Sequence, residues 1–197
     1  MGQYKMYTTN SELLEKVRAG DEAAWRLFRD TYRPLIYHCA KQHGLTPDDY
    51  PELEQIVLLS FFRVNPNFVY DPRKGKFRSY LGIIMKNCIS SIFRHKRQQA
   101  GMNKALETQK EELDDSFDEE WNREWKIHLF WLSMKNAAEQ MPEKVFQAFD
   151  LLEMKGRKAA EVASTLGISI PSVYNYRKKV IDFLRMNIAE ISNEEVE

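Results

Sequence analysis

The chain has 197 residues, of which 43% are apolar and 29% charged, with 29 basic and 29 acidic residues. Eight glycines and seven prolines are few for a fold built on many β-hairpins, and the length allows one ordinary domain or two small ones. No apolar stretch approaches the roughly 20 residues of a membrane span, the first ten residues lack an apolar core, and the only two cysteines form no CxxC pair. We therefore expect no membrane span, no signal peptide, no disulfide framework and a cytoplasmic location.

Basic and acidic residues are unevenly distributed along the chain. Residues 1–97 carry 16 basic and 10 acidic residues, a net charge of +6, whereas residues 98–140 carry 5 basic and 10 acidic residues. No acid occurs in 72–106, where nine residues are basic, and nine acids then follow in 107–124. The asymmetry is typical of a polyanion-binding segment followed by an acidic linker, although a solvated basic helix beside a solvated tail would give the same pattern.

Apolar residues at helical spacing predict an N-terminal helical domain over residues 1–97. Its helices are expected over residues 11–17, from Asp21 to the loop at 44–51, and over 52–64 and 76–97. Gly20 suits the end of the first helix, and Asp21 is a typical N-cap for the second. The long helix at 76–97 has an apolar stripe formed by Phe77, Leu81, Ile84, Cys88 and Ile92.

Residues 98–120 have many charges and few periodic apolar side chains, so they are predicted to form an acidic linker. A second helical domain, 121–197, follows. Its helices are expected from near Trp121 to just before Pro142, and over 143–154, 157–166 and 170–188. The predicted fold class is all-α, with two small domains.

The last two predicted helices have the dimensions of a helix-turn-helix. Gly167 permits positive φ in the turn, Ile168 fills the corner, and Ser169 can cap the second helix. Ile170, Val173, Val180, Ile181 and Leu184 are expected to face inward on that helix. The opposite face carries side chains that suit phosphates and base edges, namely Ser172, Tyr174, Asn175, Lys178 and Lys179. A plain helical hairpin with a solvated face is the alternative.

The basic helix at 76–97 has a polar stripe opposite its apolar one. Asn87, Ser91 and Arg94 lie at i, i+4 and i+7, beside Lys86, Arg97 and, near the end of the helix, Lys96. The loop before the helix interleaves aromatic and basic residues, which suits a single nucleic-acid strand because rings stack on bases and cations follow phosphates. These loop residues are Phe68, Tyr70, Arg73 and Lys74; Phe68 could equally be a core anchor.

The four histidines lack metal-ligand spacing, and no glycine-rich phosphate loop follows a strand. We therefore expect no catalytic site, cofactor or metal, and no enzyme activity.

Several sequence blocks, taken in order, resemble the extracytoplasmic-function class of bacterial RNA polymerase sigma factors. The likeness covers residues 10–97 and 135–188. The blocks are Glu52-Leu53-Glu54-Gln55-Ile56-Val57-Leu58-Leu59, Phe77-Arg78-Ser79-Tyr80-Leu81 with Met85-Lys86-Asn87, Met141-Pro142, Ala160-Glu161-Val162-Ala163, Leu166-Gly167-Ile168-Ser169 and Ser172-Val173. The other conserved central region of housekeeping sigma factors is missing.

The resemblance implies a protein that binds core RNA polymerase and directs transcription from particular promoters. It implies contacts to the polymerase on the 52–63 helix through Glu52, Gln55 and Leu59. It implies recognition of the −35 element by the last helix and recognition and melting of the −10 element by the segment 65–97. The residues expected to contact the −10 region are Tyr70, Arg73, Lys74, Arg78, Tyr80, Lys86, Asn87, Ser91, Arg94 and Arg97. An anti-sigma partner is left open.

The chain departs from the family pattern at several positions. Ile56 replaces an acid, Ser91 stands where Asp is common, and Tyr174 and Tyr176 stand where basic residues are common. Two other functions remain open on the sequence: a free-standing helix-turn-helix regulator, and a helical adaptor whose basic face binds an acidic protein.

Overall fold

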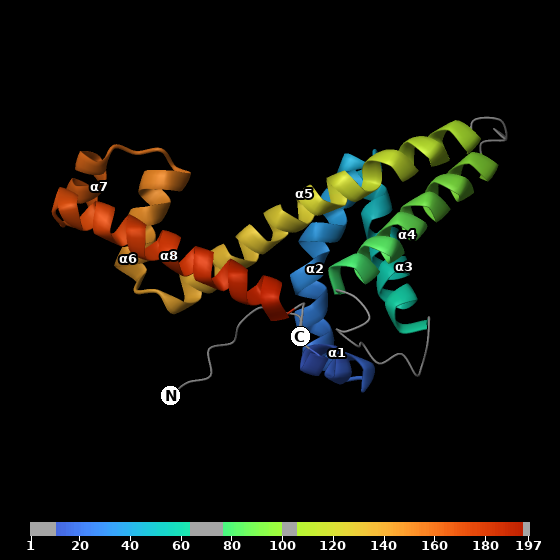
Figure 1. Cartoon of the computed structure of the whole chain (residues 1–197), viewed down its shortest axis with the longest axis horizontal. Coiled ribbons are helices and arrows are strands. Elements are labelled where there is room, and N and C mark those ends of the chain that lie inside the picture. Colours follow the sequence, from blue (N-terminus) through green and yellow to red (C-terminus); the bar gives the residue numbers. More distant parts are fainter. Residues whose placement is uncertain (1–10, 64–76, 100–105, 195–197) are drawn as a thin grey trace. The chain divides into compact units, whose positions relative to one another are not determined.

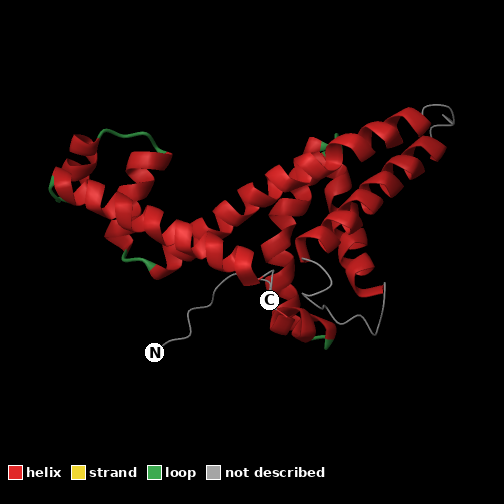
Figure 2. Cartoon of the chain, viewed as in Figure 1, coloured by secondary structure: helices red, strands yellow, loops and turns green. Residues whose placement is uncertain are grey.

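The computed structural model describes residues 11–63, 77–99 and 106–194. Every regular element among these residues is helical, and none is a strand (Figure 2). The prediction of an all-α fold is therefore confirmed. None of the described helices combines the length and the apolarity needed to cross a bilayer.

The chain divides into two compact units, and the division falls inside one long helix. The N-terminal unit extends to His128, and the C-terminal unit covers Leu129–Asn193. Each unit contains part of α5 (Leu106–Gln140). Residues 106–120 belong to this helix, whereas the sequence predicted an acidic linker there. The second domain was expected to begin near Trp121, but Trp121 and Trp125 are buried in the N-terminal unit. Phe117 is buried with them, and the spacing of four residues gives the acidic segment an apolar stripe.

The N-terminal unit is built from helices close to those that the periodicity predicts (Figure 1). Asp21 caps the second helix as expected, because its carboxylate accepts a hydrogen bond of 2.7 Å from the backbone N–H of Ala24. The elements are α1 (Ser11–Arg18), α2 (Glu22–Gln42), the 3-10 turn η1 (Pro47–Asp49), α3 (Tyr50–Arg63), α4 (Phe77–Gln99) and the first part of α5.

Aromatic side chains fill the core of the N-terminal unit. The Tyr32 ring on α2 has its centroid 4.8 Å from that of Phe28, 5.4 Å from Phe77 and 6.2 Å from Trp125. These contacts join α2 to both α4 and α5. All five residues of the predicted apolar stripe of α4 are buried, from Phe77 to Ile92. The packing therefore fixes which face of α4 points outward.

The C-terminal unit contains the last part of α5 and the helices α6 (Glu143–Phe149), α7 (Ala159–Leu166) and α8 (Ile170–Glu194). The helix expected over 143–154 is α-helical only to Phe149 and continues as the π-helical turn η3 (Asp150–Met154). Its core is mainly aliphatic and has two clusters. The first contains Met134, Ala137, Val145, Phe149, Val180 and Leu184, and the second contains Ala148, Val162, Ala163 and Val173.

Candidate nucleic-acid interface

The outward strip of α4 carries several polar side chains and no acids. Asn87, Ser91 and Arg94 are exposed, as their helical spacing predicts, and Ile83 lies on the same strip with 61% of its surface exposed. The sequence of α4 contains five lysines and arginines and no acidic residue. This strip can therefore offer an amide, a hydroxyl and a guanidinium to an anionic partner without a neighbouring carboxylate on its own helix.

The other four described residues of the expected −10 set are half-buried. They are Arg78, Tyr80, Lys86 and Arg97. The Lys86 ammonium lies 5.8 Å from the centroid of the Phe117 ring on α5, and burial raises the pKa of the Tyr80 phenol. Asn87, Ser91 and Arg94 therefore lie together on an exposed face of α4, whereas the other four residues are partly covered by the rest of the unit. Tyr70, Arg73 and Lys74, with Phe68, lie outside the described residues.

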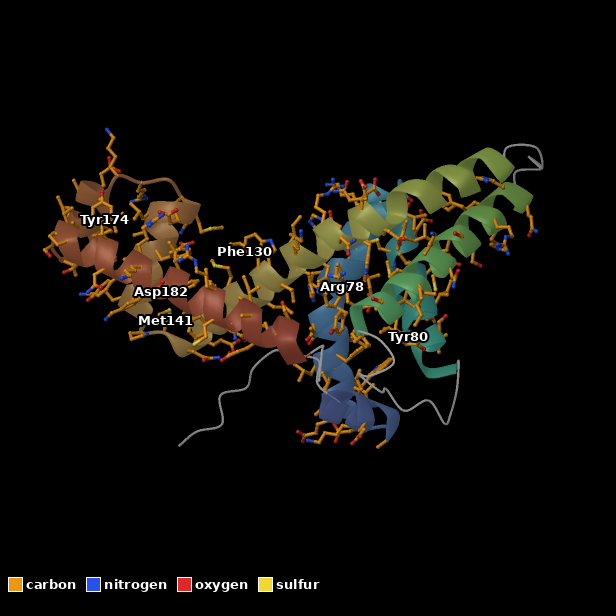
Figure 3. All side chains as sticks on the ribbon, in the orientation of Figure 1. Arg78, Tyr80, Phe130, Met141, Tyr174 and Asp182 are labelled. Carbon is orange, nitrogen blue, oxygen red and sulfur yellow. The ribbon has the colours of Figure 1, made fainter. Side chains whose placement is uncertain are left out.

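A tryptophan of α5 holds the first turns of α4 in place. The Trp121 indole N–H donates a hydrogen bond of 3.2 Å to the carbonyl oxygen of Arg78. A Cβ atom on Gly82 would lie only 2.7 Å from the Trp121 Nε1, so only glycine lets the indole approach α4 this closely. Figure 3 labels Arg78 and Tyr80 at this end of α4.

The other end of α4 is held by a buried carboxylate. The Lys96 ammonium lies 2.6 Å from the carboxylate of Asp49, which also accepts hydrogen bonds from the backbone N–H and the hydroxyl of Thr46. Burial raises the pKa of Asp49, but the hydrogen bonds from Lys96 and Thr46 outweigh it and leave that pKa below its usual value. Both ends of α4 are therefore fixed by named contacts.

The turn between α7 and α8 forms as the sequence predicts. Gly167 has a φ of 61° in the left-handed region, which favours glycine. The backbone N–H of Ser172 donates to the Ser169 hydroxyl at 3.3 Å, and the two hydroxyl oxygens lie 2.8 Å apart. Ile168 packs against the second apolar cluster, as expected for a residue that fills the corner. The Ser172 side chain is half-buried in this cap.

The outward face of α8 is basic and partly apolar. Asn175, Lys178 and Lys179 are exposed, and Tyr174 has 55% of its surface exposed. Ile170 was expected to face inward, but 45% of its surface is exposed, whereas Val173 one turn later is buried in the core. Arg177, on the inner edge, donates to the Glu153 carboxylate of η3. The first acid on the helix is Asp182, which Figure 3 labels further along α8 than Tyr174.

The expected polymerase-binding strip is also on the surface. Glu52 and Gln55 are exposed, and Leu59 has 40% of its surface exposed. The opposite side of α3 carries Glu54, which is buried where it accepts hydrogen bonds from Tyr37 and Arg29 of α2. Burial raises the pKa of Glu54, and these hydrogen bonds lower it further than burial raises it. The strip is therefore carried by a helix fixed from behind.

Two histidine–glutamate contacts between α2 and α5 were not predicted. The His38 Nδ1 lies 3.2 Å from a Glu124 carboxylate oxygen, and the His43 Nε2 lies 3.4 Å from Glu120. The spacing of the histidines in the sequence does not indicate these contacts. The available signal was the spacing of four between Glu120 and Glu124 beside the aromatic stripe of α5. These acids of the charged segment face α2 rather than the exposed strip of α4.

No protein-family model matches the chain, and a search of curated proteins finds no significant match.

Proposed function

We propose that the chain is a sigma factor of the extracytoplasmic-function class, which binds core RNA polymerase and directs it to particular promoters. In this proposal α7, the Gly167 turn and α8 form a helix-turn-helix, and α8 enters the major groove at the −35 element. The exposed strip of α4 contacts the −10 element. The polymerase supplies the catalysis.

One observation carries the proposal: each unit presents an acid-free helix face that begins in, or directly follows, a family block. On α4 this face consists of Asn87, Ser91 and Arg94, and on α8 it consists of Tyr174, Asn175, Lys178 and Lys179. Lysines can neutralise phosphates, whereas amides can hydrogen-bond to base edges. A chain with two such faces can contact two sites on one DNA molecule.

The third element of the proposal is the α3 strip of Glu52, Gln55 and Leu59. A leucine with 40% of its surface exposed next to two polar side chains suits the rim of a protein interface. The buried Glu54 cluster behind it lets the strip keep its shape during binding.

Affinity for purified core RNA polymerase tests the proposal. The full chain should bind the core enzyme tightly, and Leu59→Asp should weaken binding at least tenfold without loss of thermal stability. Ile127→Asp is the matched control, because Ile127 has a similar exposed fraction of 37% on a different helix. This control should bind like the wild type.

The two alternatives predict other outcomes. A free-standing regulator would bind specific duplex DNA without the polymerase, and an adaptor would bind neither the polymerase nor DNA specifically. Absence of binding to core polymerase, with either of these results, would exclude the sigma-factor proposal.

A further inference from the structure

The first two turns of α8 carry an apolar edge that folding does not explain. Ile170 and Tyr174 lie at i and i+4, with 45% and 55% of their surfaces exposed. Neither is among the buried or half-buried side chains of the two apolar clusters, to which α8 contributes the buried Val173, Val180 and Leu184. Two large side chains therefore keep apolar surface in water at the start of the helix.

The charges of α8 begin where this edge ends. The exposed lysines, Lys178 and Lys179, follow Tyr174 by about one turn, and the Lys179 ammonium lies 5.9 Å from the centroid of the Tyr176 ring. Asp182 comes next, and its carboxylate oxygen lies 4.0 Å from a guanidinium nitrogen of Arg185. The exposed face thus passes from apolar to basic and then to mixed charge along the helix.

This order fits a helix that enters the major groove by its N-terminal end. The first residues of such a helix reach base edges, and residues further along meet phosphates. Of the four bases, only thymine presents a methyl group in the major groove. Apolar side chains at the tip match this methyl group, and the lysines match the phosphates on the groove's edge.

We propose that Ile170 and Tyr174 read the 5-methyl group of thymine in the upstream promoter element. The inference rests on the proposed function, since it takes α8 to be the groove-binding helix. It adds a preference for thymine at one or two positions, carried by apolar contact rather than by hydrogen bonds. Burying one methyl group against such an edge should strengthen binding about fourfold.

The experiment begins with the full chain bound to core RNA polymerase, which selects duplexes from a library randomised over the upstream element. Each thymine of the enriched sequence is then replaced by uracil, which removes only the methyl group. Wild-type affinity should fall about fourfold at one or two of these positions. Ile170→Ala and Tyr174→Ala should each bind the thymine and uracil duplexes more equally than the wild type does.

Two control variants separate the apolar contact from other effects. Tyr174→Phe keeps the ring and should keep the discrimination between thymine and uracil. Met154→Ala removes a side chain of similar exposure, 42%, on η3 and should also keep it. Because both target side chains are exposed, Ile170→Ala and Tyr174→Ala should retain the wild-type melting temperature.

The outcomes distinguish this inference from the function beneath it. Enrichment of no sequence would overturn the proposed function and this inference together. An enriched element without thymine, or equal wild-type affinity for thymine and uracil duplexes, would overturn the inference alone. Loss of discrimination in Tyr174→Phe would replace the apolar contact by a hydroxyl contact. Weaker binding of Tyr174→Ala to core polymerase, with unchanged DNA affinity, would assign the edge to a protein partner.

Discussion

The two units bury polar groups of different kinds. The polar residues buried in the described part of the N-terminal unit include the ionisable Asp49, Glu54, Glu124 and His128, whereas those in the described C-terminal unit are neutral. In the C-terminal unit the Asn136 amide donates to the Asn187 side chain across α5 and α8 at 2.9 Å. Buried ionisable groups make stability depend on pH, and buried amides do not. The N-terminal unit is therefore expected to be the acid-sensitive part of the molecule.

The two candidate DNA faces differ in how far along the chain their supporting contacts lie. The α4 strip depends on contacts from distant parts of the chain, such as Trp121 and Asp49. The α8 face depends on a local turn set by Gly167 and Ser169. Damage to the part of α5 before Leu129 should therefore alter the α4 face, while the α8 face should tolerate it.

The largest expected effect is that of Trp121→Ala. The side chain is 4% exposed and packs on Phe117, Trp125 and Gly82, so its loss should reduce the free energy of unfolding by about 3–5 kcal/mol. Hydrogen exchange of the full chain should show faster exchange of α4 amides and unchanged exchange in α7 and α8. Trp131→Ala, on the same helix but at a position 54% exposed, should have little effect. Equal effects of the two variants would contradict the packing described above.

Gly82→Ala should have the next largest effect. The new methyl group would lie 2.7 Å from the Trp121 Nε1, so the indole must shift and weaken its hydrogen bond to Arg78. Overpacking of this kind costs about 1–3 kcal/mol. In a Trp121→Leu background the same change should be neutral or stabilising, because alanine favours helix over glycine by about 1 kcal/mol. A double-mutant cycle by urea unfolding measures this coupling, and additive effects would contradict it.

Asn87→Ala should affect function and leave folding intact. If the amide contacts a base of the −10 element, its loss should cost about 1–3 kcal/mol in promoter binding. An exposed asparagine contributes only a few tenths of a kcal/mol to stability, so the melting temperature should not change. Open-complex formation by the holoenzyme is the measurement. Wild-type levels of open complex would remove Asn87 from the interface.

Acid should destabilise the N-terminal unit partly through His128. Burial lowers the pKa of His128 to about 4, and its ring centroid lies 5.5 Å from that of Tyr32 on α2 and 5.6 Å from that of Trp125 on α5. Because the unfolded pKa is near 6.5, the folded state binds fewer protons between these values. The stabilising effect of the neutral ring is therefore complete above about pH 6.5 and is lost as the pH falls toward 4.

His128→Leu tests this pH dependence. Between pH 6 and pH 4.5 the free energy of unfolding, measured with urea, should fall more steeply for the wild type than for the variant. The difference should reach up to about 1.4 kcal/mol per pH unit. His43 should add to the wild-type slope, because burial also lowers its pKa against the opposing charges of Glu120 and Glu124. Parallel curves for wild type and His128→Leu would assign the acid sensitivity elsewhere.

Local rules were enough to predict most of the helices. Asp21, Gly167 and Ser169 act within a few residues of themselves, so their roles follow from residue type and spacing. The stripe of α4 was also predictable, because a helix that buries one face must show its period of 3.6 in the sequence.

The residues whose positions the sequence predicted wrongly are those whose burial or pairing depends on distant parts of the chain. The high charge of 98–120 hid the aromatic stripe of Phe117, Trp121 and Trp125, which is buried only because α2 and α4 provide a surface for it. Ile170 is apolar at a position that the helical spacing predicts to face inward, yet it is exposed while Val173 is buried. The pairing of His43 with Glu120 joins residues far apart in the sequence, so no local pattern contains it.

The smallest expected effect concerns the salt dependence of DNA binding by the α8 face. Lys178→Ala and Lys179→Ala should each lower the slope of log affinity against log salt by about 0.9, because each removes one phosphate contact and the counterion released with it. The preference among promoter sequences should stay unchanged, since phosphates carry no sequence information. Arg185→Ala is the control: Arg185 is exposed on the same helix beyond Asp182, so it should lie outside the groove and leave the slope unchanged. Holoenzyme binding to one promoter over a range of salt concentrations gives the slopes of the wild type and the three variants. If Arg185→Ala lowers the slope as much as Lys178→Ala does, net charge rather than the position on α8 determines the salt dependence of binding, and the lysines are not assigned to individual phosphates.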